Sequence, residues 1–119
     1  MTDAELVRRF EDASLSGREF THALHVRVAW IYLERYGRDE ALERMTGGLR
    51  RLVARLGQPD KFDRDLTRAW IDVIHAARTS HPGARSFEEL AAACPHLLDK
   101  PAARAAAAAV RTDPPGADS

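Results

Sequence analysis

The sequence predicts an all-α protein, a single compact bundle of about four to six helices joined by short loops. Apolar residues recur with helical spacing along almost the whole chain, whereas the alternating pattern of strands is nearly absent. The length of 119 residues, of which 45% are hydrophobic, suits one globular domain. We expect this domain to span residues 1–111 and a disordered tail to follow over residues 112–119.

The first two helices are predicted over residues 3–13 and 19–36. The second is the most apolar segment, and Gly37 follows it where a helix favours a left-handed C-terminal residue. Two adjoining apolar stripes give this helix a wide face to bury, so we expect it at the centre of the core. The stripes comprise His22, His25, Ala29, Tyr32 and Tyr36 on one line and Val26, Trp30 and Leu33 on the other.

Two further long helices are predicted over residues 39–56, with Asp39 as N-cap, and over residues 63–79. Gly47 and Gly48 lie inside the first of these, where each glycine costs about 1 kcal/mol relative to alanine. Such a pair indicates either a kink or the close approach of another backbone. The helix over residues 63–79 is predicted to bury Leu66, Thr67, Trp70, Val73, Ile74 and Ala77.

The C-terminal part of the chain predicts two shorter helices. Ser86 and Glu89 form a capping box that opens a helix over residues 86–93, which Pro95 ends. An alanine-rich helix is expected over residues 102–110 because alanine has the highest helix propensity.

The composition argues against several classes of protein. Basic and acidic residues number 18 each, and this zero net charge makes a nucleic-acid partner unexpected. No apolar run has the roughly 18 residues of a membrane span, and no signal peptide is visible at the N-terminus. Cys94 is the single cysteine, has no base near it in sequence, and is expected to be a buried inert thiol. We therefore expect a cytoplasmic protein without nucleic-acid or membrane partners.

Two histidines are the most informative feature of the sequence. His22 and His25 are three residues apart and so lie on one face of their helix, which the apolar stripe predicts to point inward. Two imidazoles at this spacing can bind one metal ion, and they can equally be hydrogen-bonded core residues.

Asp63 is the second candidate. It begins its helix in register with Thr67, Trp70 and Ile74, so its carboxylate starts on the inward stripe, although aspartate is also a favoured N-cap. The central structural prediction is that the helices over residues 19–36 and 63–79 meet, because only then can Asp63 join the histidines. Motifs of common serine hydrolases, nucleotide-binding loops and zinc ribbons are absent.

The run over residues 20–33, Phe-Thr-His-Ala-Leu-His-Val-Arg-Val-Ala-Trp-Ile-Tyr-Leu, resembles a motif of a bacterial family of small, uncharacterised helical proteins. That family motif is Phe-His-His-x-x-His-Val-x-x-Ala-Trp. The family's second motif, Tyr-His-Glu-Thr-x-Thr, falls on residues 62–67 in altered form, and a weaker block falls on residues 86–99. The resemblance covers roughly residues 5–100.

The resemblance implies that His and Glu groups converge from two helices, as in a metal site. Thr21, Asp63 and Arg64 depart from the family pattern, so the convergent set here shrinks to His22, His25 and Asp63. Two histidines and one carboxylate can bind zinc, iron or manganese. The same residues can also transfer protons without a metal, with Asp orienting His.

These residues lead to one main functional hypothesis. The protein would be a small enzyme of bacterial specialised metabolism that isomerises, cyclises or dehydrates a small molecule. His25 would be the acid or base, with Asp63 as its partner and His22 in support. The residues expected to shape the substrate pocket are Tyr32, Thr67, Trp70 and Trp30.

Three alternatives remain open at this point. The same His22, His25 and Asp63 could hold the metal of a hydrolase or oxygenase. The chain could instead be a non-catalytic helical module that binds a partner or forms a homodimer. It could also be a degenerate family member that has lost activity together with its ligands.

Overall fold

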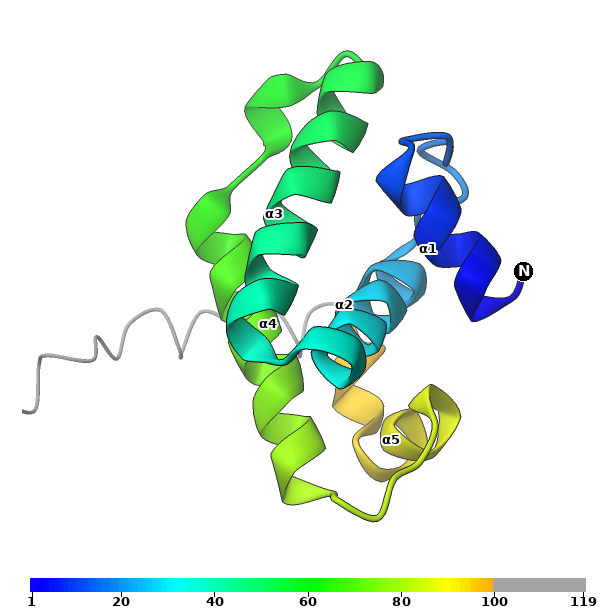
Figure 1. The fold of residues 1–119 in the computed structure, drawn as a ribbon, viewed down its shortest axis with the longest axis vertical. Helices are drawn as coiled ribbons and strands as arrows, with labels where there is room; N and C mark the ends of the chain where they lie inside the picture. The colour runs from blue at the N-terminus through cyan, green and yellow to red at the C-terminus, as the bar shows by residue number, and fades with distance from the viewer. Residues whose placement is uncertain (100–119) are drawn as a thin grey trace, which may run out of the picture.

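The computed structural model describes residues 1–99, which contain five α-helices and two short 3-10 helices (Figure 1). Residues 1–99 contain no strand, which confirms the all-α prediction. The predicted helix over residues 102–110 and the predicted tail lie outside the described residues. The helices are α1 (Asp3–Glu11), α2 (His22–Tyr36), α3 (Arg38–Arg55), η1 (Pro59–Lys61), α4 (Arg64–Ser80), α5 (Phe87–Ala93) and η2 (Pro95–Leu97).

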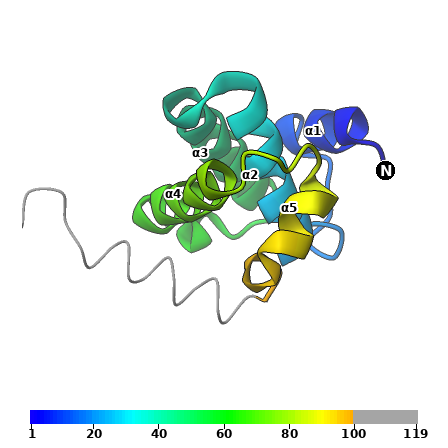
Figure 2. The ribbon, with the colours of Figure 1, turned by 90° about the horizontal axis from the view of Figure 1, so that it is seen from below.

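Helix α2 lies at the centre and packs against α1, α3, α4 and α5, and α1 also packs against α3 (Figures 1 and 2). Val26 and every residue from Val28 to Leu33 are buried, so α2 is covered around its whole circumference over residues 28–33. This confirms the prediction of a central helix. The packing of α2 against α4 confirms the prediction that the two motif-bearing helices meet. No helix within residues 1–99 is long and apolar enough to span a membrane.

Capping explains where α2 and α3 begin. The prediction that α2 begins at residue 19 was wrong by three residues, because the side chain of Thr21 accepts a hydrogen bond from the Leu24 amide at 3.3 Å. Gly37, at φ +82°, ends α2 as expected and also stands before the first residue of α3. Asp39 is therefore not the N-cap; it lies inside the first turn and pairs with Arg38 at 3.0 Å.

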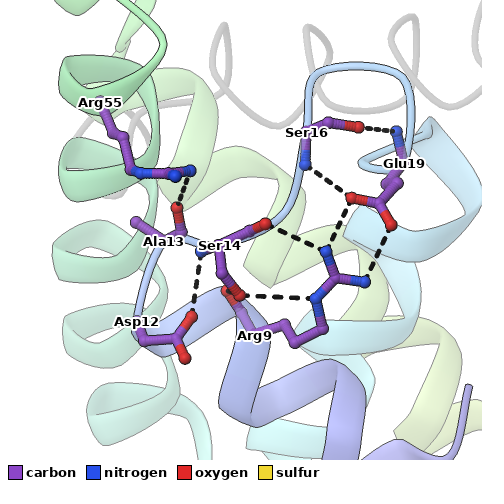
Figure 3. Close-up of polar contacts among 7 residues, drawn as sticks. All are labelled: Arg9, Asp12, Ala13, Ser14, Ser16, Glu19 and Arg55. Atoms are coloured by element: carbon purple, nitrogen blue, oxygen red, sulfur yellow. Dashed lines mark hydrogen bonds and ion pairs between the residues drawn. The ribbon is translucent and has the colours of Figure 1, made fainter.

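A polar network holds the turn between α1 and α2 (Figure 3). The Arg9 guanidinium donates to both carboxylate oxygens of Glu19 at 2.8 Å and to the Ser14 carbonyl at 3.0 Å. Glu19 also accepts from the Ser16 amide at 2.9 Å. These donors favour the ionised carboxylate and lower the pKa of Glu19 to about 2. The network fixes the chain just before Phe20, whose ring contacts His25.

Gly48 allows α1 to pack closely on α3. A Cβ at this position would lie 3.0 Å or less from three ring atoms of Phe10. Phe10 is fully buried and also stacks on Phe20, with ring centroids 5.6 Å apart. The glycine pair was expected to allow a kink or the approach of a backbone, and the neighbour at Gly48 is an aromatic side chain instead.

Candidate functional site

The first turns of α2 and α4 lie on either side of one pocket, beside the C-terminal half of α3. His25 enters it from α2, and Asp63 enters it from the residue that precedes α4. The pocket has a volume of about 120 Å³, which corresponds to about four water molecules. Its lining residues are His25, Leu49, Val53, Lys61, Phe62, Asp63, Leu66, Thr67 and Trp70.

Asp63 is both an N-cap and a pocket residue. Its Oδ1 accepts from the Leu66 amide at 3.0 Å, which is the capping bond. A carboxylate has about four acceptor sites on two oxygens, so one capping bond leaves acceptor capacity for the pocket. The hydroxyl of buried Thr67 donates to the Asp63 carbonyl at 2.8 Å and fixes this turn.

His25 is half-buried between two aromatic rings. The centroid of its imidazole lies 5.5 Å from that of Phe20 and 6.3 Å from that of Trp70. The structure therefore brings together His25, Asp63, Thr67 and Trp70, four of the residues that the sequence selected for the site.

His22 lies behind the pocket wall. Its Nε2 is 2.9 Å from the Leu97 carbonyl oxygen, and because a carbonyl only accepts, this nitrogen carries the proton. The same ring packs against Trp70, with centroids 5.2 Å apart. His22 thus ties α2 to η2 and supports the indole that forms one wall of the pocket.

Tyr32 and Trp30, the other two residues predicted to shape the pocket, do not line it. The buried hydroxyl of Tyr32 donates to the Glu11 carboxylate of α1 at 2.7 Å. Burial and this negative charge raise the pKa of Tyr32 well above its ordinary value. Trp30 packs against Phe87 of α5, with ring centroids 6.1 Å apart.

The three residues predicted to bind a metal do not form a three-ligand set. Within residues 1–99, no three His, Cys, Asp or Glu side chains are placed to hold one metal ion. His25 and Asp63 line the pocket, whereas His22 does not and packs against Trp70 and the Leu97 carbonyl instead.

Five residues of the pocket lining were not predicted as part of the site. Those expected only on buried helix faces are Leu49, Val53 and Leu66. Lys61, the last residue of η1, and Phe62 were not singled out and reach the pocket from the connection between α3 and α4. One signal was present: Lys61 and Lys100 are the two lysines among 18 basic residues, the others being arginine. A lysine next to the predicted site in a chain that otherwise uses arginine could have been singled out.

A second pair of reactive groups lies at the junction of α4 and α5. Cys94 is buried, as expected, but its Sγ is 3.4 Å from the Nδ1 of His81. That nitrogen is also 3.0 Å from the Ala77 carbonyl. A base near this thiol was not expected, because 13 residues separate the pair along the chain.

No protein-family model, curated protein or solved structure matches this chain. The family resemblance of residues 20–33 and 62–67 therefore stays a prediction. The function proposed below is therefore based on the pocket itself.

Proposed function

We propose that this protein is a small helical enzyme that transfers a proton on a small-molecule substrate held in the His25–Asp63 pocket. One observation carries the proposal. An imidazole from α2 and a carboxylate from the start of α4, 38 residues further along the chain, line the same small pocket. This is the combination that general acid–base catalysis uses.

His25 is the proton-transfer group in this proposal. Imidazole is the side chain whose unperturbed pKa lies nearest neutrality, so it both accepts and donates protons under physiological conditions. Asp63 is the charge partner that stabilises the imidazolium form. The capping bond to Leu66 supports this role because it holds the carboxylate in one place.

The pocket walls favour such chemistry. Trp70, Leu66 and Phe62 are largely apolar and reduce contact of a bound substrate with water, which strengthens electrostatic interactions inside the pocket. His22 supports the indole of Trp70 from behind, so we assign it a positioning role.

Isomerisation, cyclisation and dehydration are the reaction classes that suit this arrangement. Each removes a proton at one point of the substrate and returns one at another, and none requires an external oxidant. A hydrolase or oxygenase that depends on a metal bound by His22, His25 and Asp63 is less well supported, because these residues are not arranged as three ligands.

The first test measures the coupling between the two proposed groups. We would follow the imidazole C–H signals of His25 by NMR as pH is varied, with assignment from the His25→Asn variant. The Asp63→Asn variant retains a favoured N-cap but removes the charge. The exposed residue Asp65 lies in the same turn and does not line the pocket, so Asp65→Asn is the matched control.

We expect Asp63→Asn to lower the pKa of His25, because the imidazolium loses a negative neighbour, and Asp65→Asn to change it much less. Equal titration curves for the two variants would mean that Asp63 only caps α4. That result would remove the acid–base pair from the proposal.

The second test detects proton transfer directly. A panel of small carbonyl and hydroxy compounds is incubated with the protein in D₂O, and loss of substrate C–H signals is followed by proton NMR. A His25 acid or base contributes about 10²- to 10⁴-fold, so His25→Asn should reduce any exchange by that factor. Exchange that persists undiminished in His25→Asn would contradict the assignment.

A further inference from the structure

We propose that the pocket binds a small carboxylic acid and that the substrate's carboxylate pairs with Lys61. This inference names the substrate class for the site described above and therefore rests on the proposed function. It is based on a positively charged residue in the pocket lining that forms no ion pair with an acidic residue within residues 1–99.

Lys61 lines the pocket from the end of η1, immediately before the first turn of α4. Eight ion-pair contacts occur within residues 1–99, and none of them involves Lys61. Asp63 is the acidic residue of the lining, and it forms no ion pair with Lys61. The ammonium group of Lys61 therefore has three donors to offer to an anion.

A second cation lies at the same end of the pocket. The guanidinium carbon of Arg50 is 5.4 Å from the ring centroid of Phe62, a lining residue. Arg50 also lacks an ion pair within the described part of the chain. Lys61 and Arg50 thus place two positive charges in or beside a lining that contains one acidic residue, Asp63, and a cation in the lining without an ion pair favours an anionic ligand.

The volume limits the size of that anion. Drug-sized ligands need pockets of about 300 Å³ or more, whereas this pocket has about 120 Å³. Four displaced waters leave room for a carboxylate and a few further non-hydrogen atoms. Lys61 and His25 both line this small pocket, so we expect a ligand that pairs with Lys61 to lie beside His25.

The test uses three sets of probes matched in size, at constant ionic strength. These are short carboxylates (acetate, propionate and lactate), the neutral propionamide and the cationic propylammonium. Binding is followed through the fluorescence of Trp70 in a Trp30→Phe background and through the NMR signals of His25. Trp70 is the reporter because it lines the pocket, whereas Trp30 does not.

We expect saturable changes with the carboxylates and much weaker ones with the amide and the ammonium probe. Lys61→Gln should weaken carboxylate binding by about fivefold, the upper range for a pair of charges at an exposed residue. Arg64→Gln is the matched control, because Arg64 is an exposed cation outside the lining. It should change the affinity by less than about twofold.

Two results would overturn the inference. One is amide binding as strong as carboxylate binding, with no effect of Lys61→Gln; the pocket would then bind small molecules without selecting anions. The other is no response to any of the probes at tens of millimolar. Neither result decides the proposed function, which is judged separately by the His25 titration in Asp63→Asn, a measurement that needs no ligand.

Discussion

Two neighbouring glycines of α3 are expected to respond to alanine in opposite directions. Replacing glycine by alanine inside a helix stabilises it by about 1 kcal/mol. A Cβ at Gly47 would meet the Nη1 of Arg51 at 3.5 Å, an ordinary contact. Gly47→Ala should therefore keep most of that gain.

Gly48→Ala carries the same gain but meets the ring of Phe10. Three ring atoms would lie 3.0 Å or less from the new Cβ. The ring has little room to move, because it stacks on Phe20 and contacts Tyr32 at a centroid distance of 6.2 Å. Overpacking of a core typically costs 1–3 kcal/mol, and this overlap belongs at the upper end. We expect a net loss of about 2 kcal/mol and a difference of about 3 kcal/mol between the two variants.

Urea unfolding followed by far-UV circular dichroism measures both free energies. A double variant, Gly48→Ala with Phe10→Leu, tests the cause, because the smaller side chain should accept the new methyl group. Its destabilisation should then be less than the sum of the two single effects. Equal stability of Gly47→Ala and Gly48→Ala, or strict additivity in the double variant, would refute the explanation from close packing.

Two further predictions concern the segment before α2. The pKa of Glu19 is lowered from 4.5 to about 2 on folding, so its ion pair with Arg9 stabilises the protein above pH 4.5 and loses this effect as pH falls through 2. The difference in urea midpoint between wild type and Glu19→Gln should shrink across that range; a constant difference would contradict the assignment. Thr21→Ala should cost about 1 kcal/mol in thermal unfolding, and Thr21→Ser, which keeps the capping oxygen, almost nothing. Equal losses in these two variants would exclude the cap as the cause.

Local signals predicted most of the helices. Ser86 caps α5 and accepts from the Glu89 amide at 3.1 Å, Gly37 ends α2, and Asp63 caps α4. Each of these signals depends on a few consecutive residues, which is why it can be recognised without the tertiary structure. Errors occurred where two residues close in sequence can each serve as a cap, as with Gly37 and Asp39.

The helical register was sufficient to place His25 and Asp63 in one pocket, because both lie on inward stripes of helices that pack together. It was insufficient for Tyr32, which shares the stripe of His25. Helix α2 is covered by several neighbours, so one stripe meets different partners along its length, and at Tyr32 the partner is Glu11 of α1. Periodicity predicts that a face is buried but does not identify the neighbour.

Two lining residues between α3 and α4 were not predicted for the site at all. Lys61 and Phe62 reach the pocket from the connection between α3 and α4, where no periodicity applies. The approach of His81 to Cys94 depends in the same way on the turn between α4 and α5. Such contacts are fixed by the path of the loop in three dimensions, and a single sequence does not reveal it.

The burial of α2 on all sides over residues 28–33 predicts the order in which parts of the protein unfold. Arg27, near the middle of α2, pairs with Asp3 of α1 at 2.7 Å and with Glu88 of α5 at 3.3 Å. We expect these peripheral helices to open before α2, because residues 28–33 of α2 are covered by neighbours on every side. Native-state hydrogen exchange should therefore be slowest at the amides of residues 28–33, which report global unfolding, and faster in α1 and α5.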